Sequence, residues 1–245
     1  MNILLLDVET SPSTAYVWSL WKENIPLARL IDSSEVLCYT AKWLNDSHVY
    51  FDSIYNSPRK KMLVGIHKLL SDADAVIHYN GNNFDIPVLN KEFVLNRLGP
   101  PAPYKNIDLL RTVRNQFKFV SNKLDYVCER LGLGKKLDTD FKLWVDCMAM
   151  VPEAWKKMEE YNRHDVTLLE QLYNILRPWI KDHPNQSTYK EFSCCPNCGS
   201  INFQSRGYYY STTRKYKRYR CKDCGTWFKE ALSEKTQYTK MTGAG

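Results

Sequence analysis

The chain has 245 residues, 44% of them hydrophobic, which is typical of a globular α/β domain with a small appendage. No run approaches the ~18 apolar residues of a membrane span, and acidic residues among the first ten exclude a signal-peptide core there. We therefore expect a cytoplasmic protein with no targeting signal and no membrane partner. The net charge of +7 comes entirely from the residues after 182, which include 11 Lys and Arg but only 4 Asp and Glu. This surplus indicates an appended module that meets a polyanion.

The apolar run 3–6 predicts a strand buried on both faces, which ends in Asp7 and Glu9. Because side chains alternate along a strand, both carboxylates project to the same side. The two anions repel each other unless a cation lies between them, and Mg²⁺ or Mn²⁺ prefers such oxygen ligands. An isolated pair of this kind more often marks a turn and a solvated Glu, so the metal interpretation depends on further ligands.

Alternating and apolar patterns predict the next elements. Strands are expected at 15–20, 35–44, 49–55 and 73–78, and a helix at 58–70. Together with the opening strand, they predict a mixed sheet that contains three antiparallel strands.

A polar turn, Asn80 to Asn83, then leads into a helix with Pro87 in its first turn. Asp85 near the helix start is either an ordinary N-cap or a metal ligand. Its place after the carboxyl end of a strand, where open α/β sheets bind ligands, favours the second interpretation.

The following segment predicts an extended piece at 107–110 and helices at 122–131, 141–150 and 154–180. Asp108 is expected to be solvated or hydrogen-bonded rather than catalytic. Lys135 and Lys136 either contact a phosphate or are solvated, and none of the three is assigned to a site.

One face of the last helix carries an acidic residue among apolar ones. Spacings of three and four residues place on it Met158, Tyr161, Asp165, Leu168, Leu172, Ile175 and Trp179. A carboxylate on a buried stripe is costly unless it is paired or bound to a cation, so Asp165 is a functional candidate. Tyr161, one turn earlier, lies beside it.

Three motifs, taken together, resemble those of the DEDD superfamily of 3′-to-5′ exonucleases. They are Asp7-x-Glu9, Asn80-Gly81-x-x-Phe84-Asp85 and Tyr161-x-x-x-Asp165. The tyrosine is similar to the DEDDy branch, because the DEDDh branch would need His where this chain has Glu160. The residues of the second and third motifs resemble most those of the YprB-type ribonuclease-H-like exonucleases.

This resemblance implies a ribonuclease-H-like α/β fold over residues 1–182, with a mixed five-stranded sheet flanked by helices. It implies two Mg²⁺ or Mn²⁺ ions, with Asp7 between them, Glu9 and Asp165 on the ion that carries the attacking water, and Asp85 on the second. Tyr161 would orient that water. Asn80 and Phe84 would contact the terminal nucleotide, although Phe84 is equally compatible with a core position.

The tail, after a linker at 183–193, contains two C-x-x-C-G knuckles. Their cysteines are Cys195, Cys198, Cys221 and Cys224. Four thiolates at this spacing predict a closed tetrahedral site for one structural Zn²⁺, in a zinc ribbon over 194–232. The tail beyond it, residues 233–245, has no pattern and is expected to be disordered.

Between the knuckles, the sequence predicts a β-hairpin rich in cations and tyrosines. Its candidate nucleic-acid contacts are Arg206, Tyr208, Arg214, Lys215, Lys217, Arg218 and Arg220. Phosphate contacts combined with ring stacking hold single strands. A solvated hairpin with tyrosines packed on the zinc core is the alternative, and a protein partner with an acidic surface is another.

The leading hypothesis is a metal-dependent 3′-to-5′ exonuclease that acts on single strands or 3′ ends, DNA being favoured over RNA. A catalytically silent nucleic-acid adaptor and a structure-selective endonuclease of the same fold are the alternatives.

Overall fold

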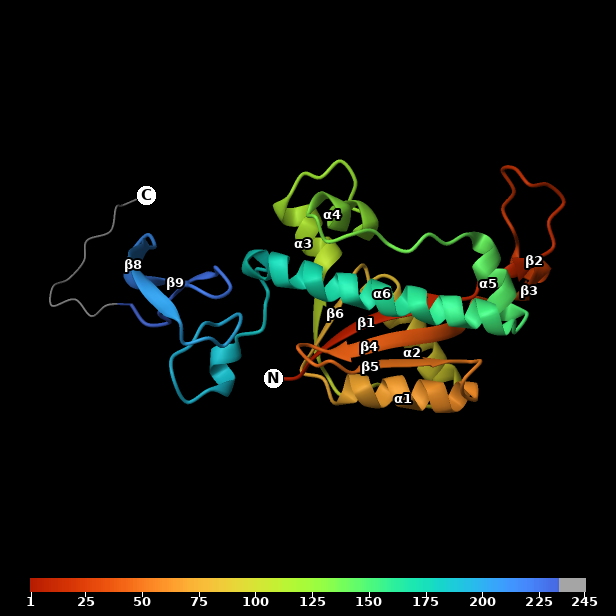
Figure 1. Ribbon diagram of the computed structural model, residues 1–245, viewed down its shortest axis with the longest axis horizontal. Coiled ribbons are helices and arrows are strands. Elements are labelled where there is room, and N and C mark those ends of the chain that lie inside the picture. The colour runs from red at the N-terminus through yellow and green to blue at the C-terminus, as the bar shows by residue number, and fades with distance from the viewer. Residues whose placement is uncertain (234–245) are drawn as a thin grey trace. The chain divides into compact units, whose positions relative to one another are not determined.

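The computed structural model describes residues 1–233, so the predicted disordered tail lies outside the described residues except for Ser233. The chain divides into two compact units (Figure 1). Residues 2–173 form the larger unit, and Met1 belongs with the described part of the chain from Asn174 onward.

The larger unit is built on a five-stranded mixed sheet in the order β5-β4-β1-β6-β7. The strands are β1 (Ile3–Thr10), β4 (Val36–Trp43), β5 (Val49–Ser53), β6 (Ala75–His78) and β7 (Lys105–Asp108). β4 runs antiparallel to both β1 and β5, whereas β1, β6 and β7 are mutually parallel. The predicted mixed sheet with three antiparallel strands is confirmed.

Helices cover both faces of this sheet (Figure 1). They are α1 (Arg59–Ser71), α2 (Asp85–Leu95), α3 (Leu109–Gln116), α4 (Leu124–Arg130), α5 (Phe141–Met148) and α6 (Pro152–Leu176). Leu4, Leu6 and Val8 of β1 share a buried cluster with residues of α1 and α2. Since side chains alternate, Asp7 and Glu9 face the side of α5 and α6.

Three expectations about local structure are wrong. The strand expected at 15–20 is only β2 (Thr14–Ala15), which pairs with β3 (Leu30–Asp32). The backbone N–H groups of Trp18 and Ser19 instead donate to the Glu23 carboxylate, at 3.0 Å each. A local side-chain acceptor thus replaces a neighbouring strand.

The expected extended piece at 107–110 is likewise wrong at its end, because α3 begins at Leu109. The Asp108 carboxylate accepts the N–H of Leu110 at 3.0 Å and caps this helix.

The buried stripe expected along the last helix holds as far as Leu172. Ile175 and Trp179, however, are 40% and 52% exposed. Leu176 and Ile180 are buried instead, so the buried positions shift by one residue after Leu172.

The second unit contains a three-stranded antiparallel sheet of β8 (Phe203–Tyr210), β9 (Lys215–Cys221) and β10 (Trp227–Lys229), in the order β10-β9-β8. A short 3₁₀ helix, Gln186–Tyr189, lies in the predicted linker. The Gln186 N–H donates to the Pro196 carbonyl at 2.7 Å, which ties this segment to the first knuckle. Across residues 1–233, no helix is both long and apolar enough to span a lipid bilayer.

Gly81 provides a test of the turn that follows β6. A Cβ atom at this position would lie 2.4 Å from the His78 ring. Gly81→Ala is therefore expected to lower the free energy of unfolding by about 1–3 kcal/mol through overpacking. Urea denaturation measures this change. Gly99→Ala is the control, since nothing lies within 4 Å of its added Cβ, and equal losses in the two variants would contradict the steric argument.

Candidate active site

Three acidic residues from two distant segments meet at the end of β1. Asp7 and Glu9 come from the strand and Asp165 from α6, and each offers a carboxylate oxygen within 4.8 Å of the other two. The structure thus brings together three of the four predicted carboxylates.

Neighbouring side chains hold this acidic cluster in place. The buried Asn162 amide donates from Nδ2 to Asp7 Oδ2 at 2.5 Å. Trp144 of α5 donates a side-chain hydrogen bond to Glu9, which favours the ionised carboxylate. The two helices therefore orient the carboxylates of the strand.

Asp85 lies beside the cluster but outside the group of three. The N–H of Val8 donates to Asp85 Oδ1 at 3.0 Å. β6 pairs with β1 only as far as Leu5, so Val8 has no strand partner on that side and the carboxylate takes its place. Asp85 does not cap α2, whose N-cap residue is Phe84, so the N-cap alternative is wrong.

Burial raises the pKa of all four predicted carboxyl groups, and neighbouring carboxylates raise it further at Asp7, Glu9 and Asp85. Desolvation, followed by the charges of Glu9, Asp165 and Asp85, holds the pKa of Asp7 well above its ordinary value. Burial raises the pKa of Glu9 to about 7, and that of Asp85 to about 7. The pocket therefore favours a bound cation over a set of bare anions.

Lys136 supplies such a cation, although the sequence analysis left it out of the site. Its ammonium forms an ion pair with Asp165 Oδ2 and donates to the Tyr161 hydroxyl at 3.2 Å. Burial lowers the pKa of Lys136, but the charges of Asp165 and Asp7 outweigh it and raise the pKa overall. No periodicity or motif marks Lys136, since it follows the loop glycines rather than lying in a regular element.

Tyr161 is buried next to Asp165 on α6. Desolvation and the Asp165 charge raise its pKa above the ordinary value, so the phenol keeps its proton at neutral pH. Asn162 was missed by the sequence analysis. It lies three residues before Asp165, and the same helical spacing that placed Tyr161 on the buried face could have placed it there.

The acidic cluster fits a hard divalent ion. Its donors are all carboxylate oxygens, the ligands such ions prefer. Asp165 Oδ1 is buried and, within the described residues, accepts no hydrogen bond. A buried acceptor without a hydrogen bond, next to two further carboxylates, has the chemistry of a metal ligand.

The second motif forms the turn between β6 and α2. Asn80 adopts a left-handed backbone conformation (φ 69°), and its N–H donates to Asp108 Oδ1 at 2.9 Å. Its side-chain oxygen accepts from Asn83 Nδ2 at 3.0 Å. Phe84 is 43% exposed, so the core alternative for this ring is wrong.

The four knuckle cysteines converge in the second unit. Their sulfur atoms lie within 4.8 Å of one another, with Cys195–Cys224 and Cys198–Cys221 separations of 3.6 Å. These distances exceed the ~2.05 Å of a disulfide and approach the ~3.8 Å edge of a tetrahedron of sulfurs around zinc. Gly199 and Gly225, with φ of 72° and 77°, allow the turns after each knuckle.

Backbone amides point at the knuckle sulfurs, as the glycine turns require. The N–H groups of Cys198 and Asn197 donate to the Cys195 sulfur, and that of Ser200 to Cys198. Without a cation, burial still raises the pKa of Cys195 to about 11. A metal ion would make these thiols thiolates, so the cluster could hold zinc.

The predicted basic contacts all lie on β8, on β9 or in the turn between them, and three of their cations lie over aromatic rings. Lys215 Nζ is 4.4 Å from the Tyr208 ring centroid, and the Arg218 and Arg220 guanidinium carbons lie 5.0 and 5.8 Å from that of Trp227. Arg218 also donates to the Arg206 carbonyl at 3.0 Å. Cations and ring edges thus share one surface.

Comparisons with known proteins agree with this fold. A family model described as the RNase_H superfamily matches residues 41–177. Of the solved structures, the family B DNA polymerase from the hyperthermophilic archaeon Pyrobaculum calidifontis is similar, with a TM-score of 0.52 and 20% identity over 72% of this chain. The match spans 24% of that polymerase chain, and at this identity it shows the fold alone. No functionally curated protein matches the sequence.

The expected ribonuclease-H-like fold is therefore confirmed. The matched span holds Asp85 and Asp165 but begins after Asp7 and Glu9. The tertiary structure places Asp7 and Glu9 next to Asp165.

The raised pKa values predict how stability depends on pH without added divalent ions. Glu9 ionises near 7 in the folded chain and near its ordinary 4.5 when unfolded, so the folded chain binds more protons between these values. The free energy of unfolding should therefore decrease as the pH rises from about 4.5 to 7, because over this range the unfolded chain loses the Glu9 proton that the folded chain keeps. Glu9→Gln removes this titration, so its stability relative to wild type should increase over that range in urea denaturation.

Glu153→Gln, an exposed change at the start of α6, is the control. It should parallel wild type at every pH, and parallel behaviour of Glu9→Gln would contradict the raised pKa.

Proposed function

The chain belongs to the RNase_H superfamily, and on that premise we propose that it is a metal-dependent 3′-to-5′ exonuclease that acts on nucleic-acid single strands or 3′ ends, DNA more than RNA. Membership of this superfamily supports a nuclease-type function. The observation that carries the proposal is the convergence of Asp7, Glu9 and Asp165, with oxygens within 4.8 Å of one another.

Two Mg²⁺ or Mn²⁺ ions are the proposed cofactors. Asp7, Glu9 and Asp165 would hold one, and Asp85 with Asp7 the other. Such ions, when bound, lower the pKa of the attacking water and neutralise the leaving 3′ oxygen. Their positive charge would also compensate for the burial and repulsion that raise the pKa values of these carboxyl groups.

Tyr161 is proposed to orient the attacking water by hydrogen bonding. Its raised pKa keeps the phenol protonated at neutral pH, which makes it a poor general base. The Lys136 ammonium lowers the pKa of Asp165 against the larger effect of burial, and so favours its ionised form. Asn162, through its bond to Asp7 Oδ2, fixes the orientation of that carboxylate.

The polarity of cleavage rests on the resemblance of the three motifs to DEDDy exonucleases. A structure-selective endonuclease would use the same carboxylates, so the geometry alone does not favour either polarity. A silent adaptor would need no clustered carboxylates, and retention of all four with Tyr161 argues against it.

The C-terminal module is proposed to be a zinc ribbon over 194–232 that binds the nucleic acid. The proposed linker 183–193 joins it to a nuclease domain over 1–182. Cys195, Cys198, Cys221 and Cys224 would hold one structural Zn²⁺. The mixed surface of cations and aromatic rings on β8 and β9 supports binding of single strands.

Removing a cluster carboxylate should abolish cleavage. Asp7→Asn or Asp165→Asn is expected to lower kcat on 5′-labelled single-stranded DNA with Mn²⁺ by at least about a hundredfold, since changes to outer-shell partners alone cost 10–100-fold. The wild-type chain should shorten the labelled strand stepwise and leave a circular strand intact.

Glu153→Gln should retain wild-type turnover. Cleavage of the circle would indicate an endonuclease, and no product with either Mg²⁺ or Mn²⁺ would indicate the adaptor.

The zinc assignment predicts metal content. Purified protein should contain one zinc per chain by elemental analysis, and Cys198→Ser should reduce this content because it removes one thiolate of four. Cys194→Ser, which changes a buried thiol outside the cluster, should retain one zinc. Full zinc content in Cys198→Ser would refute the assigned ligands.

The basic hairpin should set the salt dependence of binding. Arg214→Gln with Lys217→Gln, both exposed, is expected to flatten the slope of log K against log salt by about 1.4 for a single strand, roughly 0.7 for each lost phosphate contact. Fluorescence anisotropy with a labelled strand measures it. Lys60→Gln with Lys61→Gln on α1 should leave the slope unchanged; an unchanged slope in the hairpin variant would point to a protein partner.

A further inference from the structure

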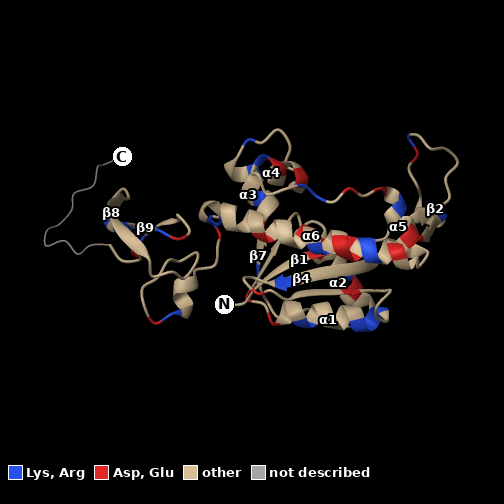
Figure 2. Ribbon diagram, viewed as in Figure 1, with Lys and Arg blue, Asp and Glu red and all other residues tan. Residues whose placement is uncertain are grey.

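The segment between β2 and β3, residues 16–29, exposes an unusual set of large apolar side chains. We call it the aromatic loop. Trp18 and Trp21 are 88% and 81% exposed, and Tyr16, Leu20 and Leu27 are also exposed. The loop extends clear of the other elements of its unit, and Lys22, Glu23 and Arg29 are its charged residues (Figures 1 and 2). Large exposed apolar side chains gathered in one segment mark an interaction site.

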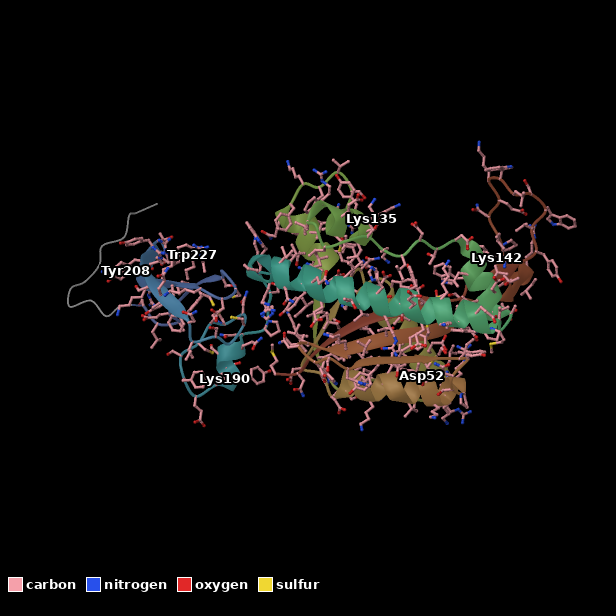
Figure 3. All side chains as sticks on the ribbon, in the orientation of Figure 1. Asp52, Lys135, Lys142, Lys190, Tyr208 and Trp227 are labelled. Atoms are coloured by element: carbon pink, nitrogen blue, oxygen red, sulfur yellow. The ribbon has the colours of Figure 1, made fainter. Side chains whose placement is uncertain are left out.

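Polar contacts, rather than the aromatic rings, give this loop its shape. Glu23 accepts the N–H groups of Trp18 and Ser19 and forms an ion pair with Arg29. The Tyr16 N–H donates to the Arg29 carbonyl at 3.0 Å, which closes the loop. The side chains of this segment reach outward from the ribbon (Figure 3). Hydrogen bonds within the loop thus hold the backbone that carries the two tryptophan rings.

An open groove adjoins the acidic cluster at Trp144, which bonds Glu9. It has a volume of about 440 Å³ and is lined by residues 10–12, 139–141 and Trp144. Trp144 packs edge-on against Tyr161, with ring centroids 5.9 Å apart, so one end of the groove adjoins the proposed catalytic tyrosine. Pro12 at the groove is two residues before β2, which carries the loop. The segment that leads into the loop thus lines the groove, and we call the groove and the loop together the binding path.

The chemistry of this path favours one occupant. Unpaired bases stack on aromatic rings irrespective of sequence, and each stacked base contributes substantially to binding. The path also ends at carboxylates suited to phosphodiester hydrolysis, which a lipid surface or an apolar protein surface would not need. A duplex offers no free base faces to Trp18 and Trp21.

We propose that the aromatic loop is a docking site for single-stranded nucleic acid, on which Trp18 and Trp21 stack unpaired bases of the strand whose end lies in the acidic cluster. This inference rests on the proposed nuclease function and names the form of its substrate. It makes the loop, in addition to the zinc ribbon, a binding surface for the strand.

The test compares full-length variants by anisotropy with a labelled 16-nucleotide DNA strand and the matching blunt duplex, without added divalent ion. Trp18→Ala with Trp21→Ala should weaken binding of the single strand at least tenfold and that of the duplex less than twofold. Trp18→Phe with Trp21→Phe should restore most of the affinity, because a phenyl ring still stacks. Leu20→Ala with Leu27→Ala removes exposed apolar area without removing a ring and should bind like wild type.

Several results would overturn the proposal. These are unchanged single-strand affinity in the alanine variant, an equal loss for duplex, or an equal loss in the leucine variant. Binding of wild-type protein to phosphatidylglycerol vesicles that the alanine variant abolishes, with strand binding intact, would assign the loop to a membrane instead.

Metal-dependent cleavage of the same strand by the wild-type chain is measured separately. Cleavage without tryptophan-dependent binding rejects only the docking site, whereas tryptophan-dependent binding without cleavage rejects only the nuclease.

Discussion

The repulsion among buried carboxylates at the end of β1 is the constraint on which the rest of the structure depends. Asp7, Glu9 and Asp165 lie within 4.8 Å of one another. Desolvation raises the pKa of all three carboxyl groups, and neighbouring carboxylates raise those of Asp7 and Glu9 further. Such an arrangement needs bound protons or a compensating cation. Lys136 provides a cation through its ion pair with Asp165, whose Oδ1 accepts no hydrogen bond within the described residues.

The sheet explains how these groups are held so closely. β1 buries Leu4, Leu6 and Val8 against α1 and α2, which turns Asp7 and Glu9 toward α5 and α6. Where β6 leaves β1, the free Val8 N–H binds Asp85 and anchors the start of α2. The hydrophobic core and the acidic cluster are thus opposite faces of the same strand.

The second unit uses a different source of stability. Its sheet is small, and two pairs of cysteine sulfur atoms, each 3.6 Å apart, occupy the place where a larger domain would have an apolar core. A basic and aromatic surface on such a module suits a strand of repeating phosphates and bases. The aromatic loop of the larger unit offers rings of the same kind, beside a groove that adjoins the acidic cluster.

Local patterns in the sequence determined much of this protein. Alternation along residues 3–9 placed Asp7 and Glu9 on one side, the helical period brought Tyr161 and Asp165 together, and the knuckle spacing identified the four cysteines. Period and spacing are properties of neighbouring residues, so they can be read without a fold. Only the tertiary structure decided the partners of these groups. Lys136 lies in a loop without periodicity, Asp85 binds a strand amide that is free only because β6 diverges, and residues 16–20 form no strand because Glu23 binds their amides. The first two contacts join segments far apart in the sequence, and all three depend on where the folded chain leaves a donor or a charge unmatched.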